Sequence, residues 1–199
     1  MKKGLLITLL ILLLIYSVGG IAFYFLKDAP SEEVKNISEI PEYGYILKSN
    51  ATAAMKEEFQ NLKEILSGDD INEEEYAKSV AKLFIIDLYT LNNKLNKYNV
   101  GGDNYVFPDA VEHFRLNVMD TLYKYIEDNS DEKREQKLPE VKSASVTEIE
   151  ETTFEYDKEE YSGYKIKLTW DYMTSEDYDK EGEVILIKKD NKYYIAEKN

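Results

Sequence analysis

Apolar residues recur at helical spacing in three stretches of the chain. The first predicted helix follows Asn50, a residue suited to the N-cap, and stops at Gly68. The second runs from Asn72 to about residue 98, and the third opens at Pro108 and reaches about residue 127. The three apolar stripes are Met55, Phe59, Leu62 and Leu66; Tyr76, Val80, Leu83, Phe84, Leu88, Leu91 and Leu95; and Val111, Phe114, Val118, Leu122 and Tyr125.

From residue 138 the apolar period changes from 3.6 to 2. Strands are predicted at 141–150, 164–172, 184–187 and 193–196, with a short strand or extended segment at 43–48. Asp190 and Asn191 mark a hairpin turn between the last two strands, whereas residues 128–137 form a charged loop. Helices followed by consecutive strands predict an α+β fold with about three helices packed on a four-stranded antiparallel sheet.

The first 27 residues predict a membrane anchor. Residues 5–26 are uncharged, and a helix of this length is about 33 Å long, enough to cross a hydrocarbon core of about 30 Å. Lys2 and Lys3 place the N-terminus in the cytoplasm and the following domain outside the cytoplasmic membrane. A cleaved signal peptide, with Gly19 and Gly20 near the cut, is the alternative. We favour the uncleaved anchor because signal peptides have an apolar region of only about 7–15 residues.

The predicted layout is therefore a cytoplasmic tip and transmembrane anchor (1–27), a linker (28–42) that contains Pro30 and Pro41, and an extracytoplasmic domain (43–199). The chain has 25 Lys and Arg against 39 Asp and Glu, for a net charge of −14. Such a surface repels nucleic acid, so we expect no nucleic-acid partner. The expected partners are the lipid bilayer, through residues 5–26, and other proteins or further copies of the chain.

The absence of cysteine excludes disulfides, thiol catalysis, thiolate metal sites and a lipoprotein anchor. Residues 177–182 begin like a calcium loop, but its twelfth position is Lys188 where a bidentate glutamate is needed. We therefore predict no metal site and no cofactor.

Asp87 and Arg115 are the charged residues that interrupt apolar stripes. A carboxylate among apolar side chains is costly unless it is paired. One interpretation is structural: Asp87 forms an ion pair with Arg115, or accepts hydrogen bonds from the backbone or from tyrosine hydroxyls. The other is functional: Asp87 is a pocket acid with a raised pKa. We favour the structural interpretation because no second catalytic group is apparent.

Tyr76 and Tyr89 are the candidate partners closest to Asp87 in the sequence. His113 is the only histidine, and it falls opposite the apolar stripe of its helix. We expect it to face solvent, and a catalytic base needs a positioned partner. No catalytic residue is therefore assigned, and Asp87, Arg115 and Tyr89 remain pocket candidates.

The paired helices, the four-strand finish and the terminal hairpin at residues 188–197 resemble the nuclear-transport-factor-2-like cone, also called cystatin-like. The order of tip, membrane helix and one such domain is similar to the bitopic subunit of type IV secretion machines. Residues 83–94 and 100–102 also resemble an uncharacterised group of Gram-positive membrane proteins. The resemblance covers about residues 43–199 and brings no catalytic motif. It implies a non-enzymatic assembly or interaction domain, and the alternative is a ligand-binding protein or enzyme that uses a cone pocket around Asp87.

Overall fold

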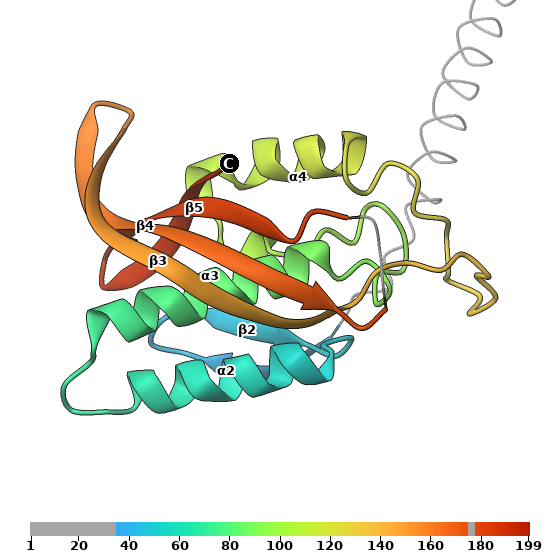
Figure 1. Ribbon diagram of the computed structural model, residues 1–199, viewed down its shortest axis with the longest axis horizontal. Helices are drawn as coiled ribbons and strands as arrows, with labels where there is room; N and C mark the ends of the chain where they lie inside the picture. The colour runs from blue at the N-terminus through green and yellow to red at the C-terminus, as the bar shows by residue number, and fades with distance from the viewer. Residues whose placement is uncertain (1–34, 175–177) are drawn as a thin grey trace, which may run out of the picture. The chain divides into compact units, whose positions relative to one another are not determined.

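A computed structural model describes residues 35–174 and 178–199 (Figure 1). A two-stranded sheet comes first and is followed by helices, 3-10 turns and a four-stranded sheet. The elements are β1 (Asn36–Ile40), β2 (Tyr45–Lys48), α2 (Ala53–Leu66), α3 (Glu73–Tyr89), η1 (Asp103–Tyr105), η2 (Pro108–Ala110), α4 (Val111–Asp120), β3 (Val141–Tyr156), β4 (Glu159–Tyr172), β5 (Glu181–Lys189) and β6 (Lys192–Lys198). The predicted α+β class, with three α-helices and a four-stranded antiparallel sheet, is confirmed.

The larger sheet is a meander of order β3-β4-β5-β6, in which all neighbours are antiparallel. Its first and last hairpins both close with two residues at positive φ, which are Asp157 and Lys158, then Asp190 and Asn191. Such turns match the right-handed twist of the paired strands. The sequence identified the second turn but not the first, and so ended the strand at residue 150 instead of Tyr156.

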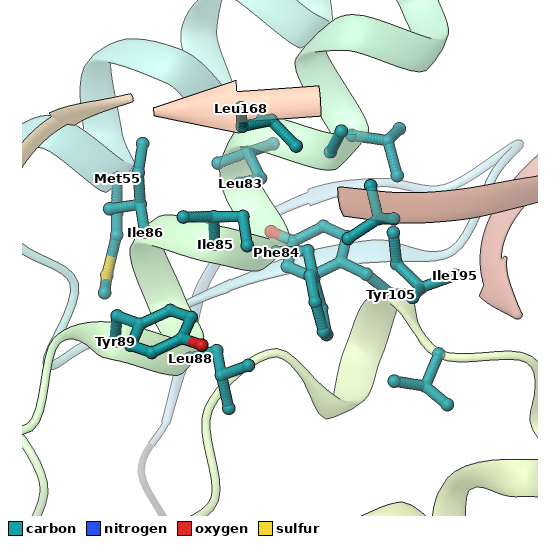
Figure 2. Packing of buried hydrophobic residues seen from close by; sticks show 14 of the residues in the cluster. Met55, Leu83, Phe84, Ile85, Ile86, Leu88, Tyr89, Tyr105, Leu168 and Ile195 are labelled. Carbon is teal, nitrogen blue, oxygen red and sulfur yellow. The ribbon is translucent and has the colours of Figure 1, made fainter. Parts of the chain in front are cut away.

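Helix α3 is the centre of the core. It contacts all four strands of the larger sheet and also packs against α2 and η1. Its buried side chains, including Leu83, Phe84 and Ile85, meet Leu168 and Ile195 from the sheet and Tyr105 from η1 (Figure 2). Because α3 is packed on nearly every side, most of its side chains are apolar, and Asp87 is the one charged residue in the middle of its apolar stripe.

The helix boundaries differ from the prediction for local reasons. Helix α2 is capped by Thr52 and not by Asn50. Helix α3 starts at the predicted cap, where Asn72 Oδ1 accepts the Glu75 amide, but it ends at Tyr89 and not near residue 98. The amides of Leu91 and Asn92 donate to the Pro139 carbonyl, so the chain leaves the helix although its apolar spacing continues.

The third predicted helix is shorter than expected. Pro108 opens the 3-10 turn η2, and α4 then ends at Asp120 instead of near residue 127. Residues 121–125 form turns, in which the Tyr123 amide still donates to the Val118 carbonyl.

The fold begins within the segment predicted as a linker. Strand β1 (Asn36–Ile40) pairs antiparallel with β2, so at least residues 36–40 of the predicted 28–42 linker belong to a sheet. The β1 side chains are largely exposed, and this explains why no apolar pattern marked the strand. The predicted membrane span, residues 5–26, lies outside the described residues. Within residues 35–174 and 178–199, no helix combines the length and apolar character needed to span a bilayer.

Candidate functional site

Asp87 lies beside a buried lysine. Lys94 Nζ is 2.6 Å from Asp87 Oδ1, and the Gly102 amide donates to Asp87 Oδ2 at 2.8 Å. The Lys94 side chain is only 3% exposed. The early end of α3 makes this pair possible, because the chain turns back and brings Lys94 under the last turns of the helix.

Arg115 pairs with a different carboxylate. Both Nε (2.9 Å) and Nη2 (2.5 Å) donate to Asp103 Oδ2, while Lys48 Nζ donates to Oδ1 at 3.1 Å. The predicted Asp87–Arg115 ion pair is therefore wrong, whereas the predicted acceptance of a backbone hydrogen bond by Asp87 is confirmed. Sequence reasoning missed Lys94, Lys48 and Asp103, since their meeting depends on the path of the loops. We call these five charged residues the charge cluster.

The charge cluster keeps Asp87 ionised. Burial by itself raises the pKa of Asp87, but the ammonium groups of Lys94 and Lys48 and the Gly102 amide outweigh it and lower the pKa below its ordinary value. This is opposite to the raised pKa expected of a pocket acid. Burial lowers the pKa of Lys94, and the adjacent Asp87 carboxylate opposes that shift. The arrangement is that of an ion pair in which each buried charge has a partner of opposite sign.

A small cavity lies next to Asp87. Its volume is about 20 Å³, and Lys48, Asp87, Asn104 and Tyr105 are among the residues that line it. A single water molecule needs at least about 10–15 Å³. The cavity therefore has room for about one water molecule and none for a substrate.

The Tyr123 side chain connects two backbone segments beside the charge cluster. Its buried hydroxyl donates to the Leu88 carbonyl at 2.8 Å and accepts the Gly101 amide at 3.2 Å. A Cβ on Gly101 would lie 2.1 Å from the Asp87 carbonyl oxygen, so only glycine fits at this crossing. The Gly101–Gly102 turn therefore lets the two backbone segments pack closely, and this places Asp103 beside Arg115.

A larger depression separates α4 from α3 and β6, and we call it the α4 groove. Its volume is about 680 Å³. The apolar part of its lining comes from three places: Phe84 and Leu88 on α3; Phe114, Val118 and Leu122 on or after α4; and Ile195 on β6 with its bridge partner Val106. Phe84 lies on α3 near Ile195 (Figure 2), and its ring centre is 5.8 Å from that of Phe114. The stripe of the third predicted helix was expected to be core, yet Val118 is its only fully buried residue within α4.

The pocket candidate Tyr89 and the single histidine, His113, both line the α4 groove. Tyr89 is buried, with its ring centre 4.7 Å from Trp170 and Lys198 Nζ 5.3 Å above its face. His113 is exposed at the rim, as predicted, and makes no hydrogen bond to any residue that the structure describes. The groove therefore offers apolar contact and an exposed imidazole, but no described nucleophile–base pair.

Tyr76, the other tyrosine near Asp87 in sequence, belongs to a separate hydroxyl network. Its oxygen lies 2.8 Å from the Tyr45 hydroxyl, which donates to the Tyr193 carbonyl at 2.7 Å. The Tyr193 hydroxyl in turn donates to Glu73. Burial raises the pKa of both Tyr45 and Tyr76, so these hydroxyls stay neutral and tie β2, α3 and β6 together.

No group of three or more His, Asp or Glu side chains that could hold a metal ion occurs within the described residues. Asp177, the first residue of the calcium-like segment, lies outside them. Comparison with protein-family models, with curated proteins and with solved structures found no match to this chain.

Proposed function

We propose that this chain is a membrane-anchored, non-enzymatic binding protein whose α4 groove takes an apolar segment of a partner protein. The observation that carries the proposal is the α4 groove itself. It is open and largely apolar, and most apolar side chains of the adjacent helix α4 are only partly buried or exposed. Apolar depressions with a polar rim mark interaction sites on folded domains. Here the rim carries His113, Asn117, Thr121, Glu197 and Lys198.

A non-enzymatic role fits the chemistry around Asp87. The carboxylate is paired with Lys94, and the adjacent cavity has room for about one water molecule. An acid–base catalyst needs a titrating group that can reach its substrate. The Lys94 ion pair and the small cavity therefore favour a binding role over an enzyme that uses a cone pocket around Asp87.

The proposed setting is the outer side of the cytoplasmic membrane, with residues 5–26 as the anchor. We infer that the helices and the curved antiparallel sheet form a nuclear-transport-factor-2-like cone, and that the domain serves an envelope assembly of the secretion or conjugation type. The α+β architecture and the sheet order are compatible with this inference. Function does not follow from fold alone, so the test addresses the groove.

Photo-crosslinking in intact membranes tests the proposal. A photoreactive amino acid at Asn117, on the groove rim, is expected to give one adduct of defined mass with a protein, whereas the same group at Lys56 on α2 gives none. Ala196→Trp fills the groove and is expected to abolish the Asn117 adduct, whereas Ala53→Trp on α2 leaves it unchanged. Absence of a protein adduct at Asn117, or an adduct that persists in Ala196→Trp, would overturn the proposal.

A small apolar ligand is the second candidate occupant. The groove volume of about 680 Å³ falls within the range of about 300–1,000 Å³ that is usual for small-molecule sites. Native mass spectrometry of the full chain, released from mild detergent, distinguishes the two. A bound small molecule that is absent from Ala196→Trp but present in Ala53→Trp supports the ligand, and its absence from the unsubstituted chain excludes this candidate.

A further inference from the structure

We propose that the outer edge of β3 binds an extended, lysine-rich segment of a partner protein by strand addition. A hollow bordered by Glu151, Tyr164 and Tyr193 would receive one of its cationic side chains. The β3 edge is the opposite edge of the sheet from β6, and Tyr193 of β6 reaches the hollow across the face of the sheet. No residue that lines the hollow also lines the α4 groove, so this is a second binding site and does not depend on the first.

The two sheet edges differ in how they are covered. On the β6 edge, Val106 forms a parallel bridge with Ile195, and the Phe107 amide donates to the Ile195 carbonyl at 2.9 Å. On the β3 edge, no described backbone group outside the sheet bonds to residues 142–156. In Figure 1 the outer part of the β3–β4 hairpin (orange) extends past the ends of the other strands. An uncovered edge of this kind is a template for another strand.

The hairpin turn fixes which amides point outward. Asp157 and Lys158 form a two-residue turn, and Tyr156 opposes Glu159 across it. Such a flanking pair exchanges both hydrogen bonds, and bonded and non-bonded pairs then alternate along the ladder. Since the register is regular from residue 148 to residue 156, the outward N–H groups belong to Ile149, Glu151, Thr153 and Glu155.

The hollow lies beside the same part of β3, on the sheet face that Glu151 shares with its cross-strand partner Tyr164. It has a volume of about 540 Å³, and Glu151, Thr153, Tyr164 and Tyr193 are among its lining residues. Tyr164 opposes Glu151 in the register, and its ring centre is 5.8 Å from that of Tyr193. No described cation forms a salt bridge with Glu151. A carboxylate beside aromatic rings is a suitable environment for a lysine or arginine side chain.

Charge identifies the occupant as basic. Strand β3 carries Glu148, Glu150, Glu151 and Glu155 but only one lysine, Lys142. Of these glutamates, only Glu148 forms a described salt bridge, with Lys167. A second copy of β3 would bring glutamates against glutamates, and like charges across a ladder are destabilising. Alternate side chains of an added basic strand would instead fall beside these carboxylates and into the hollow.

A synthetic peptide of six alternating lysine and valine residues, capped at both ends, is the probe, and the full chain in detergent micelles is the target. Fluorescence anisotropy is expected to show saturable binding that weakens with salt, and at least ten-fold weaker binding to Thr153→Pro. The Thr153 amide points outward, so proline removes no ladder hydrogen bond. Thr153→Val keeps the amide and is expected to bind like the unsubstituted chain. Far-ultraviolet circular dichroism checks that each variant is folded.

Two further arms make the test specific. In hydrogen exchange, the peptide is expected to slow the amides of residues 149, 151, 153 and 155, and to leave those of 150, 152 and 154 unchanged. Glu151→Lys is expected to weaken binding at least ten-fold, whereas Glu57→Lys on α2 has little effect. The proposal is overturned if the peptide does not bind, if Thr153→Pro binds it equally, if an alternating glutamate–valine peptide binds as tightly, or if the protected amides do not alternate.

Discussion

Lys94 Nζ lies 2.6 Å from Asp87 Oδ1, and this contact accounts for the one charged residue in the middle of the α3 stripe. The carboxylate comes from the central helix and the ammonium from the loop that follows it. Because the Lys94 side chain is almost fully buried, its charge depends on Asp87 for compensation. Asp87 therefore connects the end of α3 to the Gly101–Gly102 turn, because the Gly102 amide donates to its second carboxylate oxygen.

Asp87→Asn is expected to destabilise the domain by about 3–5 kcal/mol, the usual cost of leaving a buried charge without its partner. Urea unfolding followed by the fluorescence of Trp170, the single and buried tryptophan, measures the change. Asp120→Asn, at an exposed position, is the matched control and should stay within about 0.5 kcal/mol. Unchanged stability in Asp87→Asn would contradict the structural role assigned to this carboxylate.

Adding Lys94→Met to Asp87→Asn is expected to recover part of the lost stability. The double variant removes the buried ammonium together with its partner, and replacement of a buried ion pair by groups of similar volume is often neutral. The same urea titration gives the coupling between the two positions. Strictly additive losses would show that the two side chains do not act as a pair.

The Asp87 pair also predicts how stability depends on acid pH. The pKa of Asp87 is lowered in the folded state, so its contribution is fully present above the unfolded pKa of about 3.9. The contribution is lost as the pH falls below that value and through the folded pKa. The free energy of unfolding of the unsubstituted chain should therefore fall more steeply between about pH 5 and pH 2 than that of Asp87→Asn. Parallel curves for the two proteins would be inconsistent with a lowered pKa.

Tyr123→Phe is expected to cost about 1–3 kcal/mol, because it leaves the buried Leu88 carbonyl and Gly101 amide without their hydroxyl partner. Tyr125→Phe, two residues away and exposed, is the control and should change stability by less than about 0.5 kcal/mol. Urea unfolding of both variants measures the difference. Equal effects at the two positions would show that the Tyr123 hydroxyl does not hold this crossing.

Local patterns predicted the elements better than the contacts between them. The Asn72 cap and the Asp190–Asn191 turn each depend on only a few neighbouring residues, so the local sequence is enough to predict them. The Asp157–Lys158 turn has the same backbone form but lacks the usual asparagine or glycine, so no local pattern predicted it. Strand β1 is held mainly by pairing with β2, and Ile40 is its only buried residue, so it carries no alternating apolar pattern.

The candidate site was predictable only in part. The position of Asp87 in an apolar stripe correctly indicated that it needs a partner. The partner was not predictable, because the choice of Lys94 over Arg115 depends on the amides of Leu91 and Asn92 bonding to the distant Pro139 carbonyl. The α4 groove was hidden for another reason: a half-buried stripe that lines a groove has the same apolar spacing as one that fills a core.

The close approach of β4 and β5 at Gly163 gives the last prediction. A Cβ at this position would lie 1.8 Å from the Leu186 carbonyl oxygen, which is fixed in the sheet. Gly163→Ala is therefore expected to cost roughly 1–3 kcal/mol or more, since the two strands must separate to admit a methyl group. Urea unfolding measures the loss, and hydrogen exchange should show faster exchange around Leu186. Gly68→Ala is the control, because a Cβ there meets nothing closer than 3.7 Å, and similar losses in both variants would contradict this account of the sheet.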